Sequence, residues 1–177
     1  MYRTKKRHNQ GFTLIELLVV IAIIGVLSSV VLASLNSARA KSRDAKRLSD
    51  LRQIQNALEL HFTDKGYYPN TGGSGSYRSE CYGSAPEDVI PGLVPTYISS
   101  LPADPTMDKV ADTSCYLYTS DGTDYALLDH VIVDTNFSYL TRPTFFDPTR
   151  DGGSSGCVLD GNAFWSWKVS SPGGVCW

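Results

Sequence analysis

The apolar run from Phe12 to Leu35 constrains this chain more than any other feature of its sequence. The run contains a single charged residue, Glu16, and basic residues lie directly before it: Arg3, Lys5, Lys6 and Arg7. About twenty apolar residues in a helix are enough to cross the hydrocarbon core of a bilayer. A carboxylate inside such a segment costs roughly 2.5–3.5 kcal/mol on insertion scales. The run therefore predicts a transmembrane helix in which Glu16 has a function.

The residues around this charge resemble a known processing site. After a short basic leader, Gly11-Phe12-Thr13-Leu14-Ile15-Glu16 is similar to the start of type IV pilins and type II secretion pseudopilins, including the major G-type pseudopilins. The resemblance implies that a dedicated peptidase cuts after Gly11 and that the new N-terminal Phe12 is methylated. It also implies that Glu16 pairs with the N-terminal amine of a neighbouring subunit. A buried charge is tolerated when an opposite charge lies within hydrogen-bonding reach, so Glu16 is the candidate assembly residue.

Two other interpretations of the N-terminus stay open. A secretory signal peptide also combines basic residues, an apolar segment and small residues such as Ala38-Arg39-Ala40, although its apolar segment usually has only about 7–15 residues. An ordinary membrane anchor is the other alternative, but it gives no reason for Glu16. In both cases the chain would be a membrane-anchored or secreted binding module that does not polymerise. A mature N-terminus at Phe12 favours assembly, and one near Ser34 or Lys41 favours ordinary secretion.

After Leu35 the pattern is that of an amphipathic helix. Apolar residues at helical spacing predict a face that packs on a globular domain: Ala38, Ala45, Leu48, Leu51, Ile54, Leu58 and Phe62. The opposite face is predicted to be polar: Arg43, Lys46, Asp50, Gln53 and Glu59. Gly and Pro are absent between Val26 and Lys65, so we expect one helix from Phe12 to Lys65 that Gly66 ends.

Beyond Gly66 the sequence predicts a small antiparallel sheet. Asp121-Gly122 is a tight-turn signal between two β-prone segments, 115–118 and 124–129. A further short strand is expected around 163–169. The insert 70–92 is rich in Gly and Ser, which predicts a surface loop.

Several of these segments extend the resemblance to the pseudopilins over about residues 9–133, with matching stretches at 62–69 and 93–105. The predicted fold class is therefore α+β, a pilin fold in which a long helix lies across a small antiparallel sheet. Its expected parts are a leader peptide (1–11), a transmembrane and assembly helix (12–35), the amphipathic half of the helix (36–66) and a globular β domain with a disulfide-type tail (67–177).

The four cysteines suit an oxidising compartment. Cys81, Cys115, Cys157 and Cys176 allow several disulfide connectivities, between which the sequence does not choose. Sequential pairing would tie the insert to the sheet and close the tail on itself. A zinc site is disfavoured because no Cys-x-x-Cys pair occurs.

Calcium is the one metal for which we consider candidate ligands, because the pseudopilins that the chain resembles often bind calcium in a C-terminal loop. The weak candidate ligands are Asp121, Asp124, Asp147, Asp151 and Asp160. Asp in Gly-rich turns more often serves the turn itself. No cofactor is therefore expected, and calcium stays the weaker alternative.

No catalytic constellation is present. His8, His61 and His130 are scattered, and none of the common nucleophile, phosphate-loop or metalloprotease motifs occurs. The basic cluster 39–52 contains no aromatic residue for base stacking, so nucleic acid is not an expected partner.

We therefore expect a structural subunit of a type IV pilus-like fibre (a fimbrium) or of a type II secretion pseudopilus. The expected partners are further copies of the chain, other pilins or pseudopilins, the prepilin peptidase, an assembly platform in the inner membrane, and membrane lipid. Before assembly the chain would be a single-pass membrane protein with its globular domain outside the cytoplasm. After assembly it would belong to a cell-surface or periplasmic filament.

Overall fold

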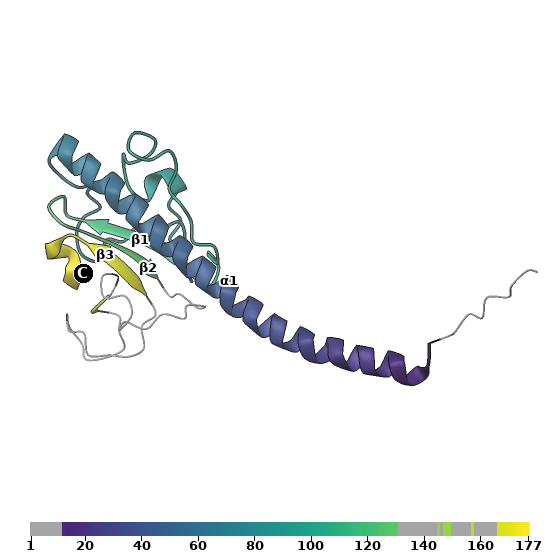
Figure 1. Cartoon of the computed structure of the whole chain (residues 1–177). Helices are drawn as coiled ribbons and strands as arrows, with labels where there is room; N and C mark the ends of the chain where they lie inside the picture. The colour runs from purple at the N-terminus through teal and green to yellow at the C-terminus, as the bar shows by residue number, and fades with distance from the viewer. Residues whose placement is uncertain (1–11, 131–144, 146, 150–156, 158–165) are drawn as a thin grey trace, which may run out of the picture. The chain divides into compact units, whose positions relative to one another are not determined.

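The computed structural model describes residues 12–130, 145, 147–149, 157 and 166–177 (Figure 1). Its elements in chain order are the helix α1 (Leu14–Lys65), the 3-10 helix η1 (Pro86–Asp88), the strands β1 (Cys115–Ser120), β2 (Tyr125–His130) and β3 (Trp167–Ser170), and the 3-10 helix η4 (Pro172–Cys176). The chain divides into two compact units, Met1–Arg39 and Ala40–Trp177, and α1 contributes to both. The predicted α+β class, a long apolar N-terminal helix with a small antiparallel sheet, is confirmed.

Helix α1 runs through 52 residues without a break. It ends at the predicted glycine: Gly66 adopts a φ of 80°, and its N–H donates to the Phe62 carbonyl at 2.7 Å. A left-handed glycine directly after the last helical residue is a common helix terminator, because it has no Cβ to clash.

The described part of the first unit consists of the apolar half of α1. Its large apolar side chains are exposed, from Phe12 and Leu14 at its start to Leu35. By length and composition, this helix is able to cross a membrane. An apolar helix that buries none of these side chains within its own chain needs lipid or other helices around it.

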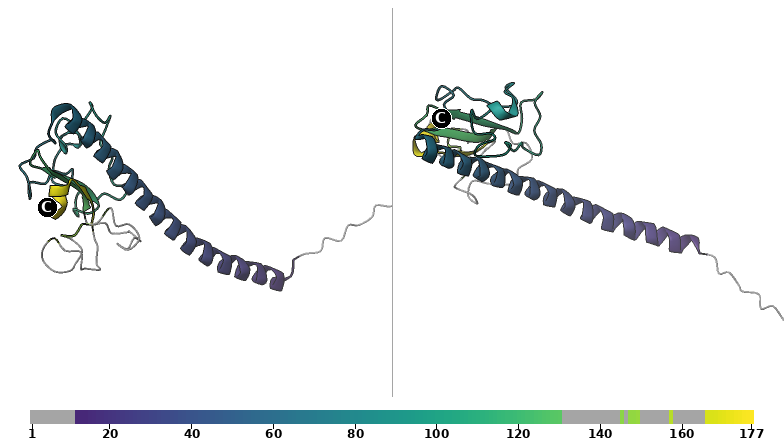
Figure 2. Two further views of the ribbon diagram at one scale, coloured as in Figure 1. Left: turned by 60° about the vertical axis from the view of Figure 1, so that its left-hand side comes forward. Right: turned by 90° about the horizontal axis from the view of Figure 1, so that it is seen from above.

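The second unit contains the sheet, whose strand order is β1-β2-β3 with antiparallel neighbours. Leu127 lies opposite Tyr118 on one side and opposite Val169 on the other. One face of the sheet packs on the second half of α1, as the views in Figure 2 show, and forms the main core with Leu51, Ile54 and Leu58.

The other face of the sheet is also buried, which explains why the strands show no alternation of exposed residues. Cys115, Leu117 and Leu128 form a second, smaller core there, and residues from the insert 70–92 and the following loop cover it: Tyr77, Cys81 and Met107. The same insert contributes Val89 and Ile90 to the main core. The interpretation of 70–92 as a surface loop is therefore wrong for these residues.

The predicted division of the helix into two faces is partly wrong. Leu48, Leu51, Ile54 and Leu58 are buried as expected, whereas Ala38 and Ala45 are exposed and Phe62 is 38% exposed. Asp50, assigned to the polar face, is buried. The buried face also includes Asp44 and Arg47, because charged partners for them lie elsewhere in the unit.

Candidate functional site: the start of the apolar helix

The predicted assembly residue, Glu16, closes a capping box at the start of α1. Its Oε2 accepts hydrogen bonds from the Thr13 N–H at 2.8 Å and from the Thr13 Oγ1 at 2.7 Å. In return the Glu16 N–H donates to Thr13 Oγ1 at 3.3 Å. This reciprocal pattern satisfies main-chain donors that would otherwise lack partners at a helix N-terminus. The sequence signature of such a box, Thr-x-x-Glu, is present at residues 13–16 but was not among the predictions above.

The capping geometry fixes the direction of the Glu16 carboxylate. It points back along the helix toward Thr13, the residue next to Phe12. The hydrogen bonds between Thr13 and Glu16 use only Oε2 of the carboxylate. Among the described residues, Oε1 is therefore open to a further donor. The Phe12 side chain is 85% exposed. Gly11, the predicted cleavage residue, lies outside the described residues.

Unlike Glu16, Arg47 is a buried charged group, near the start of the second unit. The guanidinium of Arg47 donates to Asp44 Oδ1 at 2.9 Å, to Thr106 Oγ1 at 2.7 Å and to both oxygens of Asp104, and its Nε lies 3.5 Å from Asp129 Oδ2. Burial alone would raise the pKa of Asp104, but hydrogen bonds from Arg47 and Thr106 outweigh it and hold this pKa below its ordinary value. This network ties the helix to the loop before β1 and to β2.

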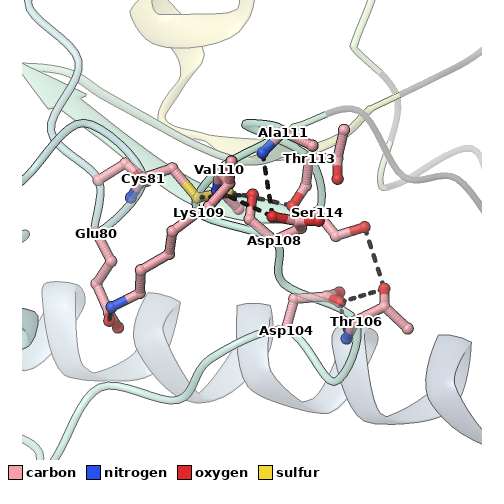
Figure 3. Close-up of a disulfide and its surroundings, with 12 residues drawn as sticks. Glu80, Cys81, Asp104, Thr106, Asp108, Lys109, Val110, Ala111, Thr113 and Ser114 are labelled. Carbon is pink, nitrogen blue, oxygen red and sulfur yellow. Dashed lines mark hydrogen bonds and ion pairs between the residues drawn. A yellow bond between two sulfur atoms is a disulfide. The ribbon is translucent and has the colours of Figure 1, made fainter.

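Two disulfides link the four cysteines sequentially, Cys81 to Cys115 and Cys157 to Cys176, which is one of the connectivities that the sequence left open. The first joins the insert to the start of β1. Beside it, Asp108 Oδ1 accepts the N–H groups of Val110 and Ala111 and shapes the intervening loop (Figure 3). Asp112 lies near both sulfurs, in the one metal-type cluster that the described residues contain. The disulfide engages both sulfurs, so this cluster is a cross-link in the structure.

Two of the calcium candidates, Asp121 and Asp124, accept hydrogen bonds within the protein. Asp121 stabilises the turn between β1 and β2, and Asp124 binds the start of η4. Asp121 Oδ1 accepts the N–H groups of Thr123 and Asp124, and the N–H of Asp124, followed by that of Thr123, lowers the pKa of Asp121. Asp124 Oδ1 accepts the Ser171 hydroxyl at 2.7 Å and the Gly173 N–H at 2.9 Å, and so holds η4. A Cβ at Gly173 would lie 2.1 Å from Asp124 Oδ2, so any other residue there would displace this carboxylate.

A third candidate, Asp147, pairs with a buried lysine. The Lys168 ammonium donates to Asp147 Oδ1 at 3.1 Å, to the Val175 carbonyl at 2.8 Å and to the Trp177 main-chain oxygen at 2.6 Å. Both side chains are at most 1% exposed. A cation thus already occupies this group of oxygens. Asp151 and Asp160 lie outside the described residues, and calcium stays the weaker alternative to a chain without a cofactor.

The histidines that are described belong to separate places in the fold. His61 is buried in α1, where its Nδ1 lies 2.9 Å from the Tyr67 carbonyl and its ring packs against Tyr67 and Tyr97. His130 ends β2. His8 lies outside the described residues.

Comparisons with known proteins point to the same end of the chain. Residues 6–32 match the family model described as the prokaryotic N-terminal methylation motif. The type II secretion system core protein G of Escherichia coli K12 is 39% identical over 101 residues, which is 54% of this chain and 66% of that protein. The protein of the same name from Vibrio cholerae is 33% identical over 102 residues, which is 57% of this chain and 68% of that protein. No solved structure matches.

A pilin is also among the relatives. The type IV major pilin protein PilA of Myxococcus xanthus is 35% identical over 60 residues, which is 34% of this chain and 27% of that protein. The alignments span 66% of the Escherichia coli relative and 47% of the Aeromonas hydrophila one, less than two thirds of either. The relatives bear the names of filament and secretion-system subunits, and the expectation of a non-enzymatic protein is confirmed. Together with the N-terminal motif and the α+β fold, they show that this chain belongs to the family of type IV pilins and type II secretion pseudopilins.

Proposed function

We propose that the chain is a filament subunit that is cleaved between Gly11 and Phe12, methylated on the Phe12 amine and assembled through the apolar half of α1. One observation carries the proposal: the sole charge in the exposed apolar run, Glu16, lies one helical turn from the cleavage bond. Removal of the leader would create an ammonium group at Phe12, close to the level of that carboxylate. Apolar helices packed side by side in a filament would then bury both charges, which requires that they pair.

The geometry of Glu16 supports a different role for each of its two carboxylate oxygens. Oε2 caps the helix of its own subunit through Thr13. Oε1 would accept the Phe12 ammonium of a neighbouring copy. An axial shift between copies would leave both charges unpaired in an apolar core, so the same contact would also set the register of the filament.

Two core protein G sequences match 54% and 57% of this chain, whereas the Myxococcus pilin matches 34%, so we propose the secretion pseudopilus rather than a surface pilus as the filament. Partners would be further copies, other pseudopilins, the prepilin peptidase and the inner-membrane assembly platform. Before assembly, α1 would hold the chain in the membrane. The two disulfides support placing the second unit outside the cytoplasm, because disulfides persist in oxidising compartments.

The processing step is tested with Gly11→Val. A branched side chain at the residue before the scissile bond should block the peptidase, so the chain should keep residues 1–11 when it is co-expressed with the enzyme. Intact-protein mass spectrometry measures the result, with Gln10→Val as the matched control that still matures. Normal maturation of Gly11→Val, or a mature start near Ser34 or Lys41, would contradict the assigned site.

The assembly step is tested by separating the charge of Glu16 from its capping role. Glu16→Gln keeps an acceptor for the capping box but removes the charge, so it should be processed and inserted yet fail to form filaments. Truncating one member of a buried ion pair typically costs about 3–5 kcal/mol. Thr13→Val removes the cap and keeps the charge, so it should still assemble. Electron microscopy of sheared fractions measures both, and normal filaments from Glu16→Gln would show that the charge is not needed.

A further inference from the structure

Two basic residues follow the apolar half of α1 and have no acidic partner within the described residues. Arg39 and Lys41 are exposed, and neither forms an ion pair with another described residue. Two basic residues further along α1 differ in this respect: Lys46 lies 2.5 Å from Asp50, and Arg47 is buried among carboxylates. Between Glu16 and Asp44 the sequence contains no acidic residue. We call Arg39 and Lys41 the basic collar.

The position of the collar along α1 places it at the level of lipid headgroups. The apolar run ends at Leu35, and α1 continues through it without a break. At about 1.5 Å per residue, Arg39 lies about 6 Å and Lys41 about 9 Å beyond Leu35 along the helix axis. The headgroup layer on each side of a bilayer is roughly 5–8 Å thick. Side chains in a helix lean toward its N-terminus, so both long side chains lean back toward the apolar half.

From these observations we propose that the basic collar binds the phosphate groups of anionic phospholipids in the leaflet where the apolar half of α1 ends. Arg39 offers a planar guanidinium for bidentate contact with phosphate oxygens, and Lys41 a compact point charge. The inference rests on the proposed membrane insertion but not on cleavage or filament assembly. It adds a lipid specificity to the unassembled subunit: anionic lipid would hold the helix at a fixed depth, and entry into a filament would have to break that contact.

Anionic lipid fits the collar better than nucleic acid does. The described helix from residue 36 to 46 has no aromatic side chain on which a base could stack. The collar is also continuous with the membrane segment, so a phosphate surface is already next to it once the helix inserts. The contact should weaken with salt, because the Debye length falls from about 10 Å at 0.1 M to about 3 Å at 1 M.

The test uses the full chain reconstituted in phosphatidylcholine bilayers that contain a small amount of spin-labelled phosphatidylglycerol. Electron spin resonance measures how strongly the protein prefers this lipid over spin-labelled phosphatidylcholine. The test variant is Arg39→Gln/Lys41→Gln. The matched control is Arg52→Gln/Lys65→Gln, which removes the same two residue types from the same helix, with Arg52 about 26 Å beyond Leu35. The leader is unchanged in all three proteins and contributes a constant background.

A basic residue near an anionic surface is worth about 1 kcal/mol, or about fivefold in binding. We therefore expect the test variant to lose the preference for phosphatidylglycerol by at least fivefold, and the control to keep it. Unchanged preference in the test variant, or equal loss in the control, would overturn the proposal. A short DNA duplex that binds the wild-type chain in neutral bilayers but not the test variant would make nucleic acid the partner instead. A chain that stays out of the bilayer would contradict the membrane insertion of the proposed function itself, whereas insertion without lipid preference contradicts the collar alone.

Discussion

At the scale of a single residue, Arg47 is a cation that the second unit buries among carboxylates. Its guanidinium is fully buried and lies within ion-pair distance of Asp44, Asp104 and Asp129. Helical periodicity assigns charged residues to the solvent face, and the partners that make this burial possible lie up to 82 residues away in the sequence, at Asp129. A sequence pattern within one helix contains no information about such distant partners, so the prediction placed Asp50 on the polar face and left Arg47 unassigned.

The first prediction at this scale concerns the removal of that guanidinium. Arg47→Met keeps an apolar stem of similar length but leaves buried carboxylates without their cation. Breaking a buried pair in this way typically costs about 3–5 kcal/mol, and we expect a loss of that size in the free energy of unfolding of the full chain in detergent. Denaturant titration followed by near-ultraviolet circular dichroism measures it. Arg52→Met is the control, because Arg52 is exposed and its guanidinium lies 5.4 Å from the centroid of the Phe145 ring rather than among carboxylates. Equal effects of the two substitutions would mean that the network contributes nothing specific.

At the scale of elements, tyrosine hydroxyls donate hydrogen bonds to acidic residues of α1 and so connect its second half to the rest of the second unit. Tyr116 donates to Asp50 at 3.0 Å, Tyr68 to Glu59 at 3.1 Å and Tyr97 to Asp64 at 2.5 Å. The helix, its stop at Gly66 and the hairpin of β1 and β2 were predictable, because local periodicity and turn residues encode them. The burial of part of the insert was not predictable. Val89 and Ile90 follow a Gly- and Ser-rich stretch, and two apolar residues after such a stretch do not form a local pattern that indicates a core.

Because Tyr68 is buried and bonded to Glu59, we expect the chain to lose stability in alkali. Burial, followed by the charge of Glu59 and the hydrogen bond to it, raises the pKa of Tyr68 to about 12. An unfolded tyrosine has a pKa of about 10, so the folded state holds the proton more tightly. The resulting stability is fully present below pH 10 and is lost as the pH rises toward 12. Thermal unfolding of the full chain between pH 9 and 12 should show this decline. Tyr68→Phe should make the decline shallower, whereas Tyr67→Phe, at an exposed position, should leave it as it is.

At the scale of the whole molecule, the two units differ in what they need around them. The described part of Met1–Arg39 buries almost nothing within the chain, and its apolar side chains need lipid or other copies. The unit Ala40–Trp177 has a main core, a second small core behind the sheet and two disulfides. Buried ion pairs add further links: Arg47, near the start of the unit, pairs with Asp104, and Lys168, near its end, pairs with Asp147. The structure thus combines a segment that depends on its surroundings with a unit that contains its own core.

The last prediction follows from this difference. A chain that begins at Ser37 lacks the apolar run but keeps the buried helix face, so it should be soluble, monomeric and cooperative in unfolding. Leu51 and Leu58 are fully buried against the sheet, whereas Leu60 on the same helix is 58% exposed. Leu51→Asp or Leu58→Asp forces a charge into an apolar contact without a partner and should abolish cooperative unfolding. Leu60→Asp makes the same chemical change at the surface and should shift the free energy of unfolding by no more than about 0.5 kcal/mol.

Size-exclusion chromatography and denaturant titration of the four shortened chains measure these outcomes. Reduction of the disulfides should lower the stability of the unsubstituted chain further, by about 2–5 kcal/mol for a small domain of this kind. If Leu51→Asp and Leu58→Asp behaved like Leu60→Asp, the helix would not be part of the core in solution. The second half of α1 would then be an extension of the membrane segment rather than the element on which the sheet is built, and the unit would have to begin after Gly66.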